Sequence, residues 1–197
     1  MAKSRKKISM SAVNSQLASN KAFRREVFKI AEKKVSASKA KLLKDFDEHP
    51  VTREIQGGHG ATNISNTLGG HGNLFTFIGF VLGSNPIGPV RRLLSQIKAT
   101  KLKKKSVGRK RIKYDLKLSI PSKETLTAIT PLPFESGRSW LYGIESGISG
   151  FGAYMYKKWR SSRSGHGIQS NQRLRSGAFK NTKYFSSMLQ QFTRRIR

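Results

Sequence analysis

Apolar residues recur at helical spacing near both ends of the chain. The first such segment begins after Asn20, a residue that commonly caps helix N-termini, and runs to about Phe46. It ends before Pro50, because a proline disfavours helical backbone in the residue that precedes it. Its apolar positions are Phe23, Val27, Ile30, Ala31, Val35, Leu42 and Phe46. The pattern predicts a long N-terminal helix with a basic outer face.

Two further segments have helical periodicity. A short one begins at Pro89, which suits the first residue of a helix, and places Val90, Leu93, Leu94 and Ile97 on one side. The last segment of the chain predicts an amphipathic C-terminal helix. Its apolar face consists of Tyr184, Phe185, Met188, Leu189, Phe192 and Ile196.

Strand patterns lie between these helices. Residues 112–120 alternate apolar and polar side chains strictly, which predicts a half-buried strand, and 124–130 is a candidate for its hairpin partner. The aromatic run 74–80 suits a buried strand, 140–147 suits one or two helical turns, and 151–159 suits a further strand. The predicted fold class is α+β: a small antiparallel or mixed β-sheet packed against an N-terminal and a C-terminal helix, with long basic loops.

The segment boundaries predict one domain with an extension. Residues 1–19 are basic, rich in serine and weakly patterned, so they are predicted to form a flexible N-terminal arm. Residues 20–197 are predicted to form a single α+β domain. This domain contains a glycine-rich loop at about 49–73 and a basic loop at about 160–178.

The charge of the chain changes this picture most. Its 197 residues contain 39 Lys and Arg against 10 Asp and Glu, a formal net charge of +29. Self-repulsion of this size opposes a compact state unless anions screen it, so we expect the partner to be nucleic acid or the acidic surface of an assembly. The chain has no cysteine, which excludes disulfides and thiolate metal sites. No signal peptide is expected, because residues 1–11 are basic and polar with no apolar stretch behind them. No membrane partner is expected, because no apolar run reaches about 18 residues.

One dense basic run is the best candidate for contact with nucleic acid. Each cation that meets a phosphate adds affinity that depends on salt and not on sequence. The other interpretation is a solvated loop between a helix and a strand. Because no motif for reading base edges is present, any contact is expected to be with the backbone. The run consists of Lys101, Lys103, Lys104, Lys105, Arg109, Lys110 and Arg111.

The sequence predicts no catalytic residue, metal ion or cofactor. The tetrapeptide Gly-Gly-His-Gly occurs twice, around His59 and His71, but no cysteine or paired carboxylate accompanies these histidines at ligand spacing. The glycines also lack the Lys-Ser/Thr step of a phosphate-binding loop. A flexible loop that orders against a neighbouring molecule is the favoured interpretation. Glu145 lies in an aromatic, glycine-rich segment, and an ion pair with an arginine is its simplest role.

The segment Trp140–Gly147 resembles a known pattern. Its order, aromatic-x-x-x-Ile-Glu-x-Gly, is similar to a segment of the tail-completion (head–tail joining, neck) proteins of tailed bacteriophages. Pro50 and Thr52 resemble the Pro-x-Thr step of that family, although Arg53 and Glu54 follow where the family usually has Gly-x-Leu. The resemblance implies a structural virion protein of the tail or neck, made in the host cytoplasm, that forms a homo-oligomeric ring, commonly with six subunits, and has no catalysis. Its implied partners are neck, tail-tube or sheath proteins and packaged DNA.

Two hypotheses therefore stand. The leading one is a neck or tail-completion subunit, for which the expected assembly contacts are Trp140, Tyr142, Glu145, His59, His71, Phe75 and Phe77. The alternative is a basic nucleic-acid-binding protein, ribosomal-like or genome-associated. The position of the charge discriminates between them, because a nucleic-acid binder concentrates its cations, whereas along this sequence they are spread from the arm to the C-terminus.

Overall fold

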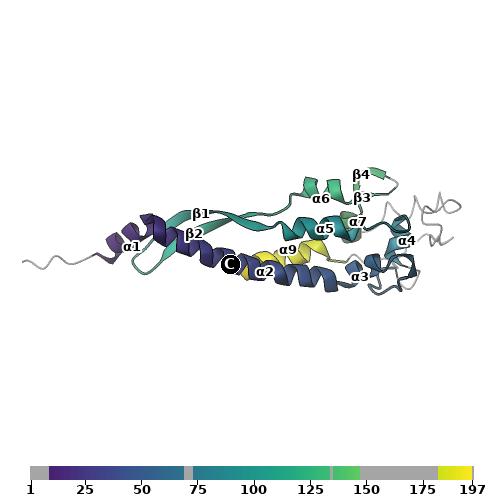
Figure 1. Ribbon diagram of the computed structural model, residues 1–197, viewed down its shortest axis with the longest axis horizontal. Helices are drawn as coiled ribbons and strands as arrows, with labels where there is room; N and C mark the ends of the chain where they lie inside the picture. Colours follow the sequence, from purple (N-terminus) through teal and green to yellow (C-terminus); the bar gives the residue numbers. More distant parts are fainter. Residues whose placement is uncertain (1–8, 69–72, 134, 147–181, 197) are drawn as a thin grey trace, which may run out of the picture. The chain divides into compact units, whose positions relative to one another are not determined.

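The computed structural model describes residues 9–68, 73–133, 135–146 and 182–196 (Figure 1). Helices and strands both occur, and each of the two sheets is an antiparallel pair, β1 with β2 and β3 with β4. The α+β class is therefore confirmed, with helices near both ends. The helices are α1 (Met10–Ser19), α2 (Lys21–Glu48), α3 (Pro50–Gln56), the 3-10 turn η1 (Gly58–Gly60), α4 (Leu74–Ile78), α5 (Ile87–Ser95), α6 (Lys123–Ile129), α7 (Trp140–Ser146) and α9 (Phe185–Ile196). The strands are β1 (Lys98–Val107), β2 (Ile112–Ser119), β3 (Pro131–Leu132) and β4 (Glu135–Ser139).

The chain divides into two compact units, where the sequence suggests one domain. Unit 1 comprises Met1–Ser38 and Ile97–Ile120, and unit 2 comprises Lys39–Gln96 and Pro121–Arg197. Helix α2 contributes its first residues to unit 1 and its last residues to unit 2. Periodicity cannot reveal this division, because one uninterrupted helical pattern runs across it.

The ends of α2 are those that the sequence predicts. The Oδ1 atom of Asn20 accepts hydrogen bonds from the backbone N–H groups of Ala22 (2.8 Å) and Phe23 (3.1 Å), which is N-terminal capping. At the other end His49 has extended backbone, and its Nδ1 atom accepts a hydrogen bond from the N–H of Val51 in the next helix. Burial lowers the pKa of His49, which favours the neutral ring that this bond requires.

The N-terminal segment differs from the expected arm. Residues 10–19 form helix α1 instead of weakly ordered chain. The Nδ2 atom of Asn14 donates hydrogen bonds to the carbonyl oxygens of Gly108 (2.9 Å) and Arg109 (3.1 Å) within unit 1. This tertiary contact fixes the helix against the β1–β2 turn, and a local sequence pattern contains no sign of it.

The strand predicted at 74–80 is wrong, because residues 74–78 form helix α4. The Oδ1 atom of Asn73 accepts a hydrogen bond from the N–H of Thr76 and caps the helix. Gly79 ends it in the left-handed conformation, with φ of 83°, which glycine adopts without steric cost. All five residues of α4 are buried, so the apolar run reflects burial on every side.

The second strand predicted at 124–130 is also wrong. These residues form α6, whose N-terminal cap is Ser122: its side-chain oxygen accepts a hydrogen bond from the N–H of Thr125. Glu124 lies in the first turn, where a negative charge suits the helix dipole. The helix-start signal of serine followed by glutamate outweighs the β-branched residues of this segment.

Unit 2 contains most of the buried apolar side chains. The helical turns predicted within 140–147 and the amphipathic C-terminal helix are confirmed as α7 and α9, and both contribute to this core. The ring of Trp140 meets that of Phe80 edge-on, with centroids 5.8 Å apart. In unit 1 the buried apolar residues of the described ranges are Ala18, Val35 and Ile97. Few apolar side chains therefore form the core of unit 1.

Among the described helices, none has the length and hydropathy needed to cross a membrane.

Candidate nucleic-acid interface

The basic run forms a strand and a turn. A solvated loop is one of its two interpretations from sequence, but residues 98–107 form strand β1, which pairs antiparallel with β2. The pairing register shifts between Ala99 and Lys101 and again between Lys104 and Ser106. Each such bulge shifts the alternation of side chains by one residue, so β1 lacks the period of two that identifies β2. The confirmed strand β2 therefore has its partner on the N-terminal side and not at 124–130.

The hairpin has one half-buried face and one exposed cationic face. Leu102 lies opposite Leu116, and Val107 opposite Ile112, on the half-buried face. On the other face Lys101 lies directly opposite Lys117, and both are exposed. Like charges at directly opposed positions destabilise a pair of strands. An anion bound between these two lysines would remove that cost.

Asp115 neutralises only part of this exposed face. It lies opposite Lys103, and its carboxylate is 3.2 Å from the ammonium group of Lys105. That ion pair is solvent-exposed on both sides, so it contributes little to stability. The face therefore keeps a net positive charge.

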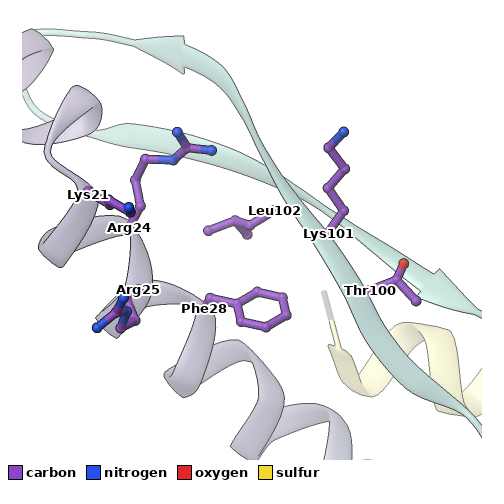
Figure 2. A pocket seen from close by; sticks show the side chains of 7 residues that line it. All are labelled: Lys21, Arg24, Arg25, Phe28, Thr100, Lys101 and Leu102. Carbon is purple, nitrogen blue, oxygen red and sulfur yellow. The ribbon is translucent and has the colours of Figure 1, made fainter.

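Helix α2 supplies further cations in the same unit. Lys21, Arg24 and Arg25 from α2, with Thr100 and Lys101 from β1, line an open groove of about 420 Å³. Figure 2 shows the side chains of Phe28 and Leu102 extending from the helix and the strand into the space between them. The groove thus has an apolar floor and cationic edges.

The two units differ strongly in charge. The described residues of unit 1 (9–38 and 97–120) include 16 Lys and Arg and 3 Asp and Glu. The described residues of unit 2 include 11 Lys and Arg and 7 Asp and Glu. In the described part of the chain the excess cations are therefore concentrated in unit 1, although they look evenly spread along the sequence.

The residues predicted to contact nucleic acid all belong to this hairpin. Lys101 and Lys103 lie on its exposed face, whereas Lys104 is paired opposite Tyr114 on the other face. The cations at 109–111 lie in the β1–β2 turn, where the side chain of Asn14 donates hydrogen bonds to the carbonyl oxygens of Gly108 and Arg109. All seven are exposed: Lys101, Lys103, Lys104, Lys105, Arg109, Lys110 and Arg111. Sequence reasoning missed Lys117 and Phe28, which only strand pairing and the helix–hairpin packing bring to the site.

Burial corrects part of the predicted set of assembly contacts. Trp140, Phe75 and Phe77 each expose 2% or less of their surface, so they form the core of unit 2 and offer no surface to a neighbour. Tyr142 is half-buried beneath the ammonium group of Lys123, and burial raises the pKa of its hydroxyl. His59 is exposed, and His71 lies outside the described residues.

Glu145 has a different role from the ion pair expected. Its Oε1 atom accepts a hydrogen bond of 2.6 Å from the N–H of Ser186, in the first turn of α9. A carboxylate at this position satisfies a helix-terminal donor and suits the positive end of the helix dipole. Glu145 therefore joins α7 to the C-terminal helix.

The glycine-rich loop is anchored by buried polar groups that the sequence analysis did not single out. Glu54 is fully buried, and its two carboxylate oxygens accept hydrogen bonds from the N–H groups of Ser65 (2.8 Å) and Leu74 (2.7 Å). The Nδ2 atom of Asn73 donates to the carbonyl oxygens of His59 and Ala61. Where it is described, the loop is held by its own unit. A glutamate between apolar positions of a short helix is the sequence signal for this anchor.

Nothing in the described ranges gathers three or more histidine or acidic side chains as a metal site would. No protein-family model matches the sequence, and comparison with curated proteins and with solved structures finds no significant similarity.

Proposed function

We propose that this chain binds the phosphate backbone of nucleic acid through unit 1. The observation that carries the proposal is the concentration of uncompensated cations on the hairpin and the adjoining helix, with Lys101 held opposite Lys117. A polyanion stabilises such a surface by replacing repulsion between neighbouring cations with attraction. The thin core of unit 1 supports the same conclusion, because little buried apolar surface opposes that repulsion.

The contacts are with phosphates and not with base edges in a groove. Lysines on an exposed strand face supply positive charge to phosphates. They do not supply the matched hydrogen-bond donors and acceptors with which side chains tell one base pair from another. Binding is therefore expected to be independent of sequence.

The salt dependence of DNA binding tests this function. Full-length protein should bind a labelled random-sequence duplex with an affinity whose logarithm falls linearly with the logarithm of salt concentration, with a slope of about −5 if five or six phosphates are contacted. Fluorescence anisotropy measures both quantities. Absence of binding at low salt, or a slope near zero, would contradict the proposal.

A second candidate is a ring-forming subunit in the neck or tail end of a tailed bacteriophage. The residues of α7 that resemble that family belong to the core of unit 2: Trp140 and Ile144 are buried, and Glu145 accepts a hydrogen bond from the first turn of α9. The α+β architecture with helices near both ends also agrees with the resemblance. The two functions are compatible, since the residues that support them lie in different units and a neck ring encloses the path of DNA.

The oligomeric state tests this second candidate. Purified protein should elute as a closed ring whose mass, measured by light scattering, is a whole multiple of the subunit mass, commonly six-fold. Rings should also be visible by negative-stain microscopy. A strict monomer at all concentrations, with and without DNA, would count against a ring subunit while leaving backbone binding intact.

A further inference from the structure

The groove in unit 1 has apolar side chains beside its cations, and binding to phosphates alone would not require them. Phe28 and Leu102 are half-buried, so part of an aromatic ring and of a leucine side chain faces the groove (Figure 2). Its volume of about 420 Å³ lies in the range of small-ligand sites, about 300–1,000 Å³. A half-exposed ring beside cations provides a surface on which a planar group can stack.

The charged side chains around the groove are all cationic. Its lining includes Lys21, Arg24, Arg25 and Lys101 and no carboxylate. Within the described residues neither Arg24 nor Lys101 has an acidic side chain within ion-pair distance. The nearby Glu26 is hydrogen-bonded to Lys29, which lowers the pKa of the Glu26 carboxyl. The groove is therefore electrostatically complementary to an anion.

We infer that this groove binds single-stranded nucleic acid, with one base stacked on Phe28 and the flanking phosphates against the cations of α2 and β1. The inference rests on the proposed backbone binding and adds the form of nucleic acid preferred. In a duplex the base faces are covered by their neighbours, so Phe28 gains nothing from them. An unpaired base offers a free face, and every base has one, so the preference is for single strands and not for sequence.

A second copy of this chain is a poorer occupant. It would have to bring acidic groups to the cations of the groove, and several of its acids are already engaged. Asp47 is bound by Arg91, Asp45 by Arg195, and Glu54 is buried. A nucleic-acid backbone supplies one negative charge per nucleotide, and none of these charges is already engaged in an ion pair within the protein.

The test compares single and double strands. Labelled oligothymidylate of about 20 nucleotides and a duplex of the same length are titrated with full-length wild type, Phe28→Leu and Arg24→Gln. Leucine keeps apolar volume at position 28 but removes the ring. Phe28→Leu should therefore lose roughly 5- to 150-fold in affinity for oligothymidylate, which is the cost of losing one base–aromatic stack. Its affinity for the duplex should not change. Arg24→Gln should weaken both complexes.

A gain-of-signal variant makes the test independent of lost stability. Phe28→Trp should bind oligothymidylate at least as tightly as wild type, and its added tryptophan fluorescence should be quenched as bases stack on it. Circular dichroism establishes that each variant is folded.

The failures of the two proposals are distinguishable. If wild type binds neither probe at low salt, the proposed function fails. If it binds both but Phe28→Leu binds oligothymidylate as tightly as wild type and Phe28→Trp is not quenched, backbone binding stands and the stacking site is overturned. If Phe28→Leu instead dissociates an oligomer and leaves both affinities unchanged, the groove is an interface between copies and the inference is overturned.

Discussion

Replacing Lys101, Lys103 and Lys117 together by glutamine should weaken binding to duplex DNA about 100- to 1,000-fold near 0.1 M salt, and should make the salt slope shallower by about 3. The three lysines lie on the exposed face of the β1–β2 hairpin. Each phosphate contact that is lost removes the release of its counterions, and the three losses multiply. Fluorescence anisotropy over a series of salt concentrations measures both effects.

Replacing only Lys101 and Lys117 by glutamine should make the free protein more stable, not less. Lys103 is left unchanged in this variant, because it lies opposite Asp115 and its loss would remove an attraction. Lys101 and Lys117 are directly opposed, so removing both charges removes repulsion worth roughly 0.2–1 kcal/mol. Loss of DNA affinity together with a small gain in melting temperature separates a binding role from a folding role. A fall in stability would show that these lysines support the hairpin itself.

A matched control separates local contact from overall charge. Lys41, Arg92 and Lys183 are exposed residues of unit 2, and changing all three to glutamine removes the same charge from the chain. We expect this control to lose only a few-fold in affinity. If it loses as much as the hairpin variant, binding depends on net charge and not on unit 1.

Glu54→Ala should destabilise unit 2 by roughly 2–5 kcal/mol, because the N–H groups of Ser65 and Leu74 lose their acceptor. Both oxygens of this fully buried carboxylate are used, so alanine leaves two donors unpaired and a cavity beside them. Glu54→Gln keeps one oxygen acceptor and should lose less. Urea denaturation monitored by circular dichroism measures the free energy of unfolding.

Glu48→Ala is the control for the loss of an acidic residue. Glu48 is exposed, and within the described residues its ion pair is the 3.8 Å contact with Lys44, which is worth little. Hydrogen exchange at the Leu74 amide adds a local readout, since it should accelerate in Glu54→Ala and not in Glu48→Ala. If both variants unfold at the wild-type urea concentration, Glu54 does not anchor the loop.

Helices α2 and α9 and strand β2 could be predicted because their burial follows a regular period. Each buries one side and exposes the other, so its apolar residues recur with the period of the element. The capping signal at Asn20 and the break at His49–Pro50 are equally local, and the structure confirms both.

Helices α4 and α6 could not be predicted in this way. Helix α4 is buried on all sides, so its residues carry no period, and its caps at Asn73 and Gly79 decide between helix and strand. In α6 the cap at Ser122 opposes a β-branched composition. Strand β1 was missed for a third reason, because its two bulges break the alternation that would reveal it.

The sequence by itself determined that this protein carries a net charge of +29, that its fold class is α+β and that a lysine-rich run is the candidate contact. Only the tertiary structure decided where that charge gathers, because residues far apart in sequence meet only through strand pairing and helix packing. Pairing set Lys117 opposite Lys101, and packing placed Phe28 beside Leu102 in a cationic groove. Burial likewise turned Trp140 from an expected contact into core, since accessibility depends on what covers a side chain and not on its neighbours in sequence.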